Sequence, residues 1–385
     1  MNNYRFLTPP SIYYGVGALE NSCDKLTTLG KNPLIVSDQI MTDLGYIDRL
    51  VKNLREKHIE CSIFNNINTE PTDQYVEKGM QLFKENNCDF LIALGGGSPI
   101  DTAKAIGIMI NNPGEIKDYI GLGKIKKEGL PVVAIPTTAG TGSEVTQFTI
   151  ITDTKNDVKM LIGSEYVIPK MAINDPVLTF SVPPKTTAAT GIDALTHAIE
   201  AYTSRKHQPL TDVLALSSIG RISKYLRRAW ANGDDDEARS QMMLAAMEAG
   251  MAFNNSSVTI VHGMSRPVGA LFHVPHGISN AVLLPACMEY AIMGIPERFM
   301  DIANAMGANT KNLSALSGAK IGVDLVKQLC IDIEIPTISG LGVNKDEFMK
   351  KTDKMATDAL ASGSPKNTAR KPTKEEIIKI YEKSL

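Results

Sequence analysis

One carboxylate and several imidazoles in the second half of the chain have the spacing of metal ligands. Asp193 and His197 are four residues apart in the helical run GIDALTHAIEAY, so both side chains would lie on one helix face. Three of the other five histidines, His262, His273 and His276, cluster in VHGMSRPVGALFHVPHG. Three imidazoles and one carboxylate suit Fe(II) or Zn(II) and leave a position for a substrate oxygen. The spacing therefore predicts a metal site but leaves open which clustered histidines bind it, the alternative being hydrogen-bonded core histidines.

Two turns of small residues in the first half have the composition of a nucleotide site. A buried run at 89–94 leads into GGGS at 95–98 and then a helical stretch, which offers backbone N–H groups and a helix N-terminus to a pyrophosphate. TTAGTGSE at 137–144 follows the next buried run. Both turns would lie at the carboxyl ends of sheet strands, where ligands of open α/β sheets bind. Because GGGS is neither GxGxxG nor a Walker loop, a tight turn without a ligand stays an alternative.

Asp38 ends the strand-like run LIVSD. A carboxylate there could accept hydrogen bonds from an adenosine ribose and would repel a 2′-phosphate, so it favours NAD over NADP. The alternative is a helix N-cap or turn aspartate.

Short β-branched runs alternate with helical stretches up to about residue 175, at 33–38, 61–64, 89–94 and 131–136. Runs that are apolar on both faces predict a parallel sheet covered by helices. Turn residues at 152–157 between two further strand-like runs predict an inserted β-hairpin. After Pro183 and Pro184 long helical patterns replace the strands. The sequence thus predicts an α/β part followed by a helical part, with a boundary near residue 180.

Composition agrees with two domains and a small-molecule function. The chain has 385 residues, more than the roughly 250–300 at which single cores stop growing. A net charge of −2, with acids and bases intermixed, argues against nucleic acid and anionic membranes as partners. The five cysteines show no CxxC spacing, which indicates neither disulfides nor a thiolate zinc site. Without a signal-like start or an apolar run of about 18 residues, we expect a cytoplasmic protein.

These motifs together resemble those of the iron-containing (group III) alcohol dehydrogenases. The resemblance covers essentially the whole chain, in the family's order, through GGGSPIDTAKAI, IPTTAGTGSE, INDP, AATGIDALTHAIEAY, GMAFNN and HGMSRPVGALFHVPHG. Among subgroups the chain looks closest to 1,3-propanediol dehydrogenases, lactaldehyde reductases and NAD-dependent methanol dehydrogenases. The resemblance implies a dehydroquinate synthase-like fold, with a dinucleotide-binding α/β domain at 1–180, an all-helical metal-binding catalytic domain at 181–385, and an active site in the cleft between them.

Carried over by motif, the resemblance also assigns site residues. The implied metal ligands are Asp193, His197, His262 and His276. The implied cofactor contacts are Asp38, Gly95, Gly96, Gly97, Ser98, Asp101, Thr137, Thr138, Thr141, Ser143 and Lys159. Phe148 and Phe253 would line the pocket near the nicotinamide and the substrate. Some relatives have a histidine where this chain has Arg266, so His273 becomes the candidate for a proton relay, with a pocket-wall role as its alternative.

The resulting prediction is an NAD(H)-dependent oxidoreductase that interconverts a primary alcohol or diol and its aldehyde by metal-assisted hydride transfer. Fe(II) is the expected metal and Zn(II) a possible substitute. The alternatives are a glycerol or polyol dehydrogenase of the same superfamily, a dehydroquinate synthase, and a non-catalytic protein that responds to NAD or metal. A homo-oligomer, dimer or larger, is expected.

Overall fold

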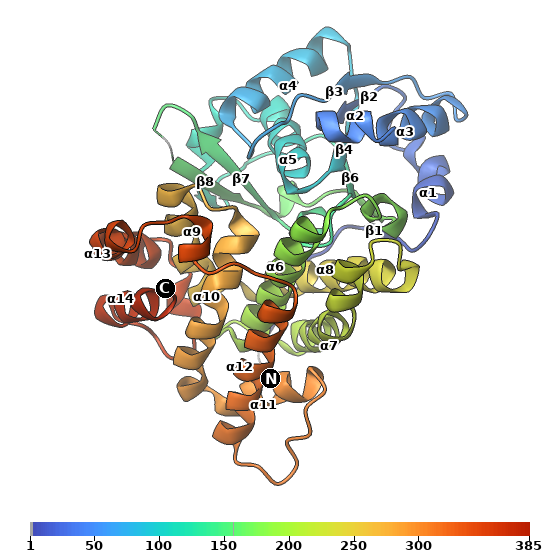
Figure 1. The fold of residues 1–385 in the computed structure, drawn as a ribbon. Helices are drawn as coiled ribbons and strands as arrows, with labels where there is room; N and C mark the ends of the chain where they lie inside the picture. Colours follow the sequence, from blue (N-terminus) through green and yellow to red (C-terminus); the bar gives the residue numbers. More distant parts are fainter. Residues whose placement is uncertain (1–2, 157) are drawn as a thin grey trace. The chain divides into compact units, whose positions relative to one another are not determined.

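The computed structural model describes residues 3–156 and 158–385, which group into two compact units (Figure 1). One unit is Leu7–Ser181, and the other is Val182–Leu385 together with residues 3–6. None of the described helices combines the length and the apolar character needed to cross a membrane.

The first unit alternates strands and helices. Its strands are β1 (Ser11–Tyr14), β2 (Pro33–Val36), β3 (Ser62–Phe64), β4 (Phe90–Gly95), β5 (Gly121–Leu122), β6 (Val132–Pro136), β7 (Phe148–Asp153), β8 (Val158–Gly163) and β9 (Met171–Asn174). Its α-helices are α1 (Ala18–Leu26), α2 (Gln39–Asp43), α3 (Tyr46–Arg55), α4 (Asp73–Glu85) and α5 (Gly97–Asn111). Among the described residues, a six-stranded parallel sheet has the order β1-β9-β6-β4-β2-β3, and a small sheet has the order β5-β8-β7.

The central strand β4 shows why its sequence is apolar without alternation. Leu91 and Ala93 belong to a core cluster that includes residues of α4 and α5, whereas Ile92 and Leu94 belong to a second cluster with residues of α1 and α3. Helices therefore cover both faces of the sheet, and every side chain of β4 is buried. This confirms the predicted parallel sheet.

The predicted hairpin is present as the antiparallel pair β7 and β8, although residue 157 of its turn lies outside the described residues. Three strands were not predicted, and one of them, β5, has only two residues. β1 (SIYY) and β9 (MAIN) are only four residues long, so neither shows enough of a pattern to be distinguished from a loop. They pair with each other, and β9 joins them to β6.

The second unit is helical, as predicted. Its α-helices are α6 (Pro184–Thr203), α7 (Pro209–Ala231), α8 (Asp236–Ser256), α9 (Ile260–Phe272), α10 (His276–Ala291), α11 (Pro296–Ala305), α12 (Ala315–Asp332), α13 (Lys345–Ala361) and α14 (Lys374–Lys383). α6, green in Figure 1, packs against α7, α8 and α10. Residues 191–203 of α6 are all buried, so polar side chains on this stretch lie in the interior of the unit. Asp193 and His197 are two of them.

Candidate metal centre and nucleotide-binding turns

Three helices bring potential metal ligands to one point inside the helical unit. Asp193 lies on α6, His262 on α9, and His276 is the first residue of α10. One ligand atom from each side chain lies within 4.8 Å of the others. The Asp193 Oδ1 atom is 3.9 Å from His262 Nε2 and 3.7 Å from His276 Nε2. The structure therefore brings together three of the four residues that the sequence predicts as ligands.

His197, the fourth predicted ligand, borders this group. It is one turn further along α6 from Asp193, and its Nδ1 atom is 3.9 Å from Asp193 Oδ2. Its ring stacks on His262, with centroids 4.5 Å apart, and on Phe253, with centroids 4.2 Å apart. The i, i+4 spacing thus places His197 beside the cluster, and Phe253 contacts the face of its ring.

A glycine next to His276 allows α10 to begin close to α6. A Cβ atom on Gly277 would lie 2.6 Å from the carbonyl oxygen of Ala189, a distance that real Cβ atoms essentially never show. Only glycine therefore lets the first turn of α10 approach the α6 backbone this closely. This approach places His276 opposite Asp193.

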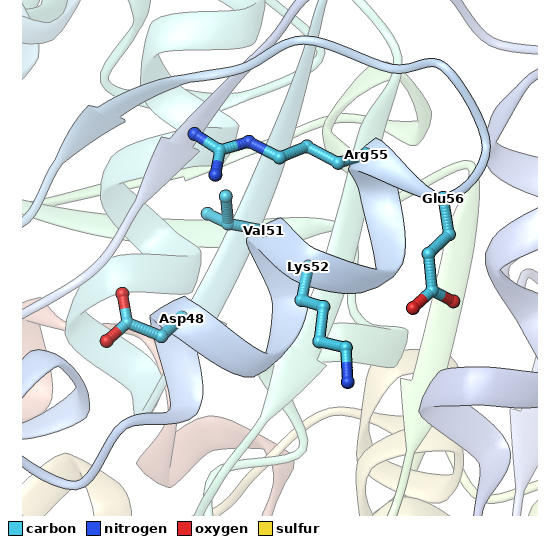
Figure 2. Close-up of a pocket in the computed structure, with 5 residues that line it drawn as sticks. All are labelled: Asp48, Val51, Lys52, Arg55 and Glu56. Atoms are coloured by element: carbon cyan, nitrogen blue, oxygen red, sulfur yellow. The ribbon is translucent and has the colours of Figure 1, made fainter.

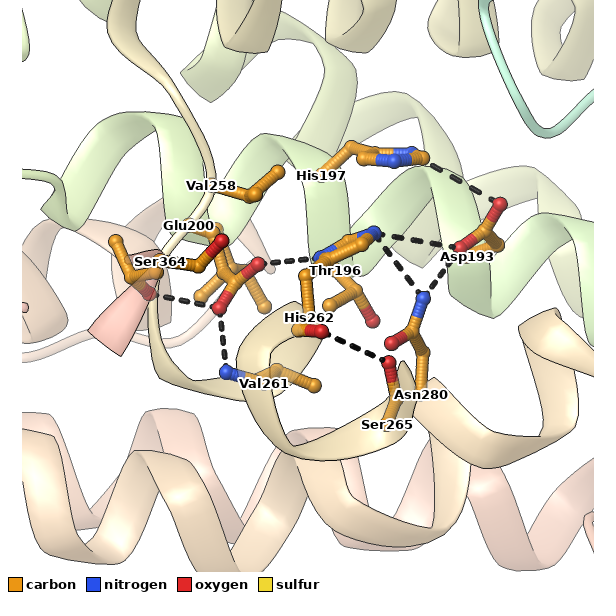
Figure 3. A network of polar contacts seen from close by, with 12 residues as sticks. Asp193, Thr196, His197, Glu200, Val258, Val261, His262, Ser265, Asn280 and Ser364 are labelled. Atoms are coloured by element: carbon orange, nitrogen blue, oxygen red, sulfur yellow. Dashed lines mark hydrogen bonds and ion pairs between the residues drawn. The ribbon is translucent and has the colours of Figure 1, made fainter. Parts of the chain in front are cut away.

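The Asn280 amide marks the point where the ligand atoms converge. Its Nδ2 atom lies 2.7 Å from Asp193 Oδ1 and 3.1 Å from His262 Nε2 (Figure 3). It also lies 3.2 Å from His276 Nε2. The amide has two N–H groups for these three neighbours, and both imidazoles turn their Nε2 atoms toward it. Burial lowers the pKa of His262 to about 4, which keeps its ring neutral at physiological pH. One carboxylate and imidazoles whose Nε2 atoms converge fit Fe(II) or Zn(II).

Glu200 holds the other nitrogen of His262. The His262 Nδ1 atom contacts Glu200 Oε2, while Glu200 Oε1 accepts from the Thr259 hydroxyl at 2.7 Å and from the Val261 N–H at 2.6 Å (Figure 3). Glu200 is not among the site residues predicted from the sequence. A signal was present in the motif, because Glu200 is seven residues after Asp193 and therefore lies on the same face of α6.

Arg266 lies within α9, and His273 directly follows this helix. Arg266 is one turn after His262, and its guanidinium donates to the Ser364 hydroxyl at 3.3 Å. Burial lowers the pKa of Arg266, and attraction to the Glu200 carboxylate opposes this effect. His273 is the C-cap of α9, with a φ of 54°, and is exposed. His273 is not part of the ligand group formed by the described residues.

The two small-residue turns lie side by side in the α/β unit. β4 and β6 are adjacent strands, and each leads into one turn. A Cβ atom on Gly97 would lie 3.0 Å from the Thr141 side chain, and one on Gly96 would lie 3.7 Å from the Thr138 side chain. Gly95 has a φ of +149°, a conformation that residues with a Cβ rarely adopt. The predicted neighbourhood of the turns is therefore present.

Asp38 caps a helix and also borders the first small-residue turn. Its side chain caps α2 by accepting a hydrogen bond from the Met41 N–H at 3.0 Å. Its Oδ2 atom also lies 3.3 Å from the position that a Gly95 Cβ would occupy, so the carboxylate borders the first turn. Burial raises the pKa of Asp38.

A buried lysine that is not among the predicted site residues attaches the second turn to α5. Lys104 is 1% exposed, and its ammonium donates to Ser143 Oγ at 2.9 Å, to the Thr146 carbonyl at 3.0 Å and to the Phe148 carbonyl at 3.0 Å. It also contacts the Ser143 carbonyl. Burial lowers the pKa of Lys104 to about 8, opposed by Asp101 and by another nearby carboxylate. The only sequence signal was a lysine inside the otherwise apolar run of IDTAKAI.

Asp101 and Ser143, both predicted to contact the cofactor, form a hydrogen bond with each other. The Ser143 hydroxyl donates to Asp101 Oδ1 at 2.5 Å, and the Ile150 N–H donates to Asp101 Oδ2 at 2.8 Å. Burial raises the pKa of Asp101, while attraction to Lys104 opposes it. These contacts tie α5, the second turn and β7 into one assembly.

Two other predicted residues lie on the small sheet. Lys159 is on β8, and its ammonium is 2.6 Å from a carboxylate oxygen of Glu70. Phe148 begins β7 and packs over Gly163 of β8, where an added Cβ would lie 2.9 Å from its ring. The buried Thr137 follows β6 directly.

A shallow pocket elsewhere in this unit lies along α3 (Figure 2). None of the predicted site residues lines it. Its lining residues are Asp48, Val51, Lys52, Arg55 and Glu56.

Both halves of the chain match family models. Residues 9–176 match the model described as iron-containing alcohol dehydrogenase, and residues 187–385 match the C-terminal model of the Fe-containing alcohol dehydrogenase family. The chain is 38% identical to 1,3-propanediol dehydrogenase of Citrobacter freundii and to NAD-dependent methanol dehydrogenase of Bacillus methanolicus, with 99% of each chain covered.

Solved structures give the same match. The crystal structure of a 1,3-propanediol oxidoreductase superposes with a TM-score of 0.97 at 38% identity, and an alcohol dehydrogenase from Oenococcus oeni superposes with a TM-score of 0.96 at 35% identity. Each comparison covers 100% of both chains.

Replacing Lys104 by methionine tests the link between α5 and the second turn. Methionine removes the donor and leaves buried carbonyl oxygens unsatisfied, which costs about 1–3 kcal/mol in the free energy of unfolding. Because the turn loses its attachment, we also expect NAD affinity to fall about tenfold in calorimetric titration. The control is Lys84→Met, at an exposed position of α4, which should change neither quantity. Unchanged NAD affinity in the Lys104 variant would contradict a positioning role.

Proposed function

Because the chain belongs to the iron-containing alcohol dehydrogenase family, we propose that Asp193, His262 and His276, with His197, hold its iron for the oxidation of a short primary alcohol or diol. The membership confirms the predicted class of enzyme, an alcohol dehydrogenase that interconverts alcohols and aldehydes, and the predicted cofactors, NAD and iron. The observation that carries the residue assignment is the convergence of the three ligand atoms at the Asn280 amide.

The ligand residues act by their charge and by the direction of their lone pairs. Asp193 is the one carboxylate in the group, and His262 and His276 turn their Nε2 atoms toward it. Iron bound by these atoms would supply a Lewis acid that polarises the oxygen of the alcohol or aldehyde. The apolar ring of Phe253 shields one face of His197, which supports the proposal that this aromatic side chain borders the substrate.

We assign the NAD site to the α/β unit and propose the predicted domains, 1–180 for the dinucleotide and 181–385 for the metal and catalysis. The backbone N–H groups of the turns at 95–98 and 137–144 would bind the pyrophosphate, supported by the N-terminus of α5. Asp38, beside Gly95, would accept hydrogen bonds from the adenosine ribose.

The remaining assigned roles are proposals as well. Lys159 and Phe148, on the small sheet, would contact the cofactor and the substrate. His273 is exposed at the end of α9, three residues before His276, which supports a role in passing a proton to solvent. A homo-oligomeric state and a cytoplasmic location stay predictions.

The names of the relatives do not select one substrate. Relatives at 38% identity are named for 1,3-propanediol, for methanol and, in Geobacillus thermodenitrificans, for long-chain alcohols. We propose 1,3-propanediol or a similar short primary alcohol as the substrate, with lactaldehyde reduction and glycerol oxidation as the main alternatives. A single methylene changes binding by only about 1–3 kcal/mol, so the choice depends on details of the pocket.

A substrate panel tests the proposed function directly. Protein reconstituted anaerobically with Fe(II), and separately with Zn(II), is assayed by NADH formation with 1,3-propanediol, methanol, ethanol, butanol, 1,2-propanediol and glycerol. We expect the highest kcat/KM for a short primary alcohol or diol with Fe(II). Glycerol as the best substrate would favour the polyol alternative, and no turnover with any alcohol or aldehyde would contradict the proposal.

Replacing a ligand histidine tests the metal assignment. In His262→Ala or His276→Ala, one of the converging nitrogen atoms is lost, so we expect the protein to retain less than a tenth of its iron and nearly no turnover. Metal content is measured by mass spectrometry of the purified protein, with circular dichroism as the test of folding. His58→Ala, at an exposed histidine of the α/β unit, is the control. Full activity in a variant that holds no metal would exclude this site.

Asp38→Asn tests the role of this carboxylate in cofactor choice. Asparagine caps helices as well as aspartate does, so α2 should remain intact while the negative charge is lost. Without repulsion of a 2′-phosphate, we expect the ratio of kcat/KM for NADP to kcat/KM for NAD to rise at least tenfold, or about 1.4 kcal/mol. The exposed Asp43→Asn, at the end of the same helix, is the control. An unchanged ratio would leave Asp38 with only its capping role.

A further inference from the structure

Glu200 is a buried carboxylate that none of the assigned roles uses. It lies on α6 and is 1% exposed. Taking a carboxylate out of water costs several kcal/mol unless other groups satisfy it, so a charge buried this deeply has partners that compensate it. Here each oxygen is engaged: Oε1 accepts from Thr259 and Val261, and Oε2 contacts His262 Nδ1.

The contact with Nδ1 determines which nitrogen of His262 carries the proton. A carboxylate can only accept, so the Nδ1 atom must donate, and the neutral ring then has its lone pair on Nε2. The Asn280 amide, 3.1 Å from Nε2, can donate to the lone pair of this tautomer. The contact with Glu200 thus selects one tautomer, in which the lone pair faces Asp193 and Asn280.

The start of α9 fixes the orientation of the Glu200 carboxylate that contacts His262. Thr259 is the N-cap of this helix, and Val261 lies in its first turn. Both donate to the same oxygen of Glu200, and this leaves the second oxygen directed at the imidazole. Attraction to the Glu200 carboxylate also raises the pKa of Arg266, one turn further along α9, against the lowering effect of its burial.

From this geometry we propose that Glu200 is a positioning residue, which fixes the rotation and the tautomer of His262 so that its Nε2 atom is ready to bind the metal. The inference rests on the proposed metal site. It concerns how the site is preorganised, and it adds to the site a residue that does not touch the metal.

Glu200→Gln tests this proposal, because the side chain keeps its shape while one carboxylate oxygen is replaced by an NH₂ group. The amide oxygen can still accept from Thr259 and Val261, but the NH₂ group then faces His262 Nδ1 as a donor. The ring must protonate Nε2 instead or rotate away, and either change removes the lone pair from the metal position. Loss of a partner of this kind weakens metal binding about 10–100-fold.

The measurement is the affinity for Zn(II) in competition with a chromophoric chelator, repeated with Fe(II) under anaerobic conditions. The matched control is Glu248→Gln, the same substitution at a buried glutamate of α8 whose partners are Ser217 and Arg221. We expect this control to bind Zn(II) as the wild type does, even if its thermal stability falls. An affinity of Glu200→Gln equal to that of the control would overturn the proposal.

A second variant covers the case in which Glu200→Gln does not fold. Thr259→Val removes one of the two donors that hold Oε1 and leaves the carboxylate in place. We expect its Zn(II) affinity to fall several-fold, and wild-type affinity in this variant would likewise contradict the proposal. If the wild type itself binds no metal, the proposed function fails, whereas a metal-binding wild type with an unaffected Glu200→Gln variant removes only the inference about Glu200.

Discussion

The helical unit depends on a group of polar side chains that meet in its interior, where water cannot satisfy them. Asp193, His197 and Glu200 all lie on the fully buried stretch of α6, and each would destabilise the fold without a partner. The partners of Asp193 and Glu200 come from α10 and from the start of α9, so the packing of these helices against α6 is fixed by hydrogen bonds as well as by apolar contacts. The same contacts turn the ligand atoms toward one point, which makes stability and metal binding consequences of one arrangement.

The α/β unit also contains a buried charged side chain that other groups must satisfy, in this case a cation. The ammonium of Lys104 is buried among oxygen atoms of the loop between β6 and β7, and Asp101 lies beside it. Glycines give the first turn its freedom of conformation, but the second turn owes its position to this lysine. A turn that binds a ligand through backbone N–H groups must be held in place by something other than its own short side chains, and α5 supplies that attachment.

Sequence spacing predicted the parts of the site that one helix or one strand determines. The i, i+4 relation placed Asp193 and His197 on one face, and the two turns at adjacent strand ends are indeed neighbours. Spacing could not decide between His273 and His276, because Val274 and Pro275 separate two helices there. The chain leaves α9 through a left-handed residue, so His273 ends exposed while His276 begins α10 beside Asp193.

Glu200, Asn280 and Lys104 could not be selected from the sequence because their roles depend on contacts made across 39–87 positions of the chain. Asn280 nevertheless shows how local and distant constraints combine. It is four residues after His276 on α10, so the first turn of this helix directs both side chains to the same side. That turn reaches α6 only because Gly277 has no side chain, and the approach of two backbones therefore sets the distance over which the proposed ligands Asp193 and His276 face each other. The geometry of the proposed metal site therefore depends on how closely these two helices pack.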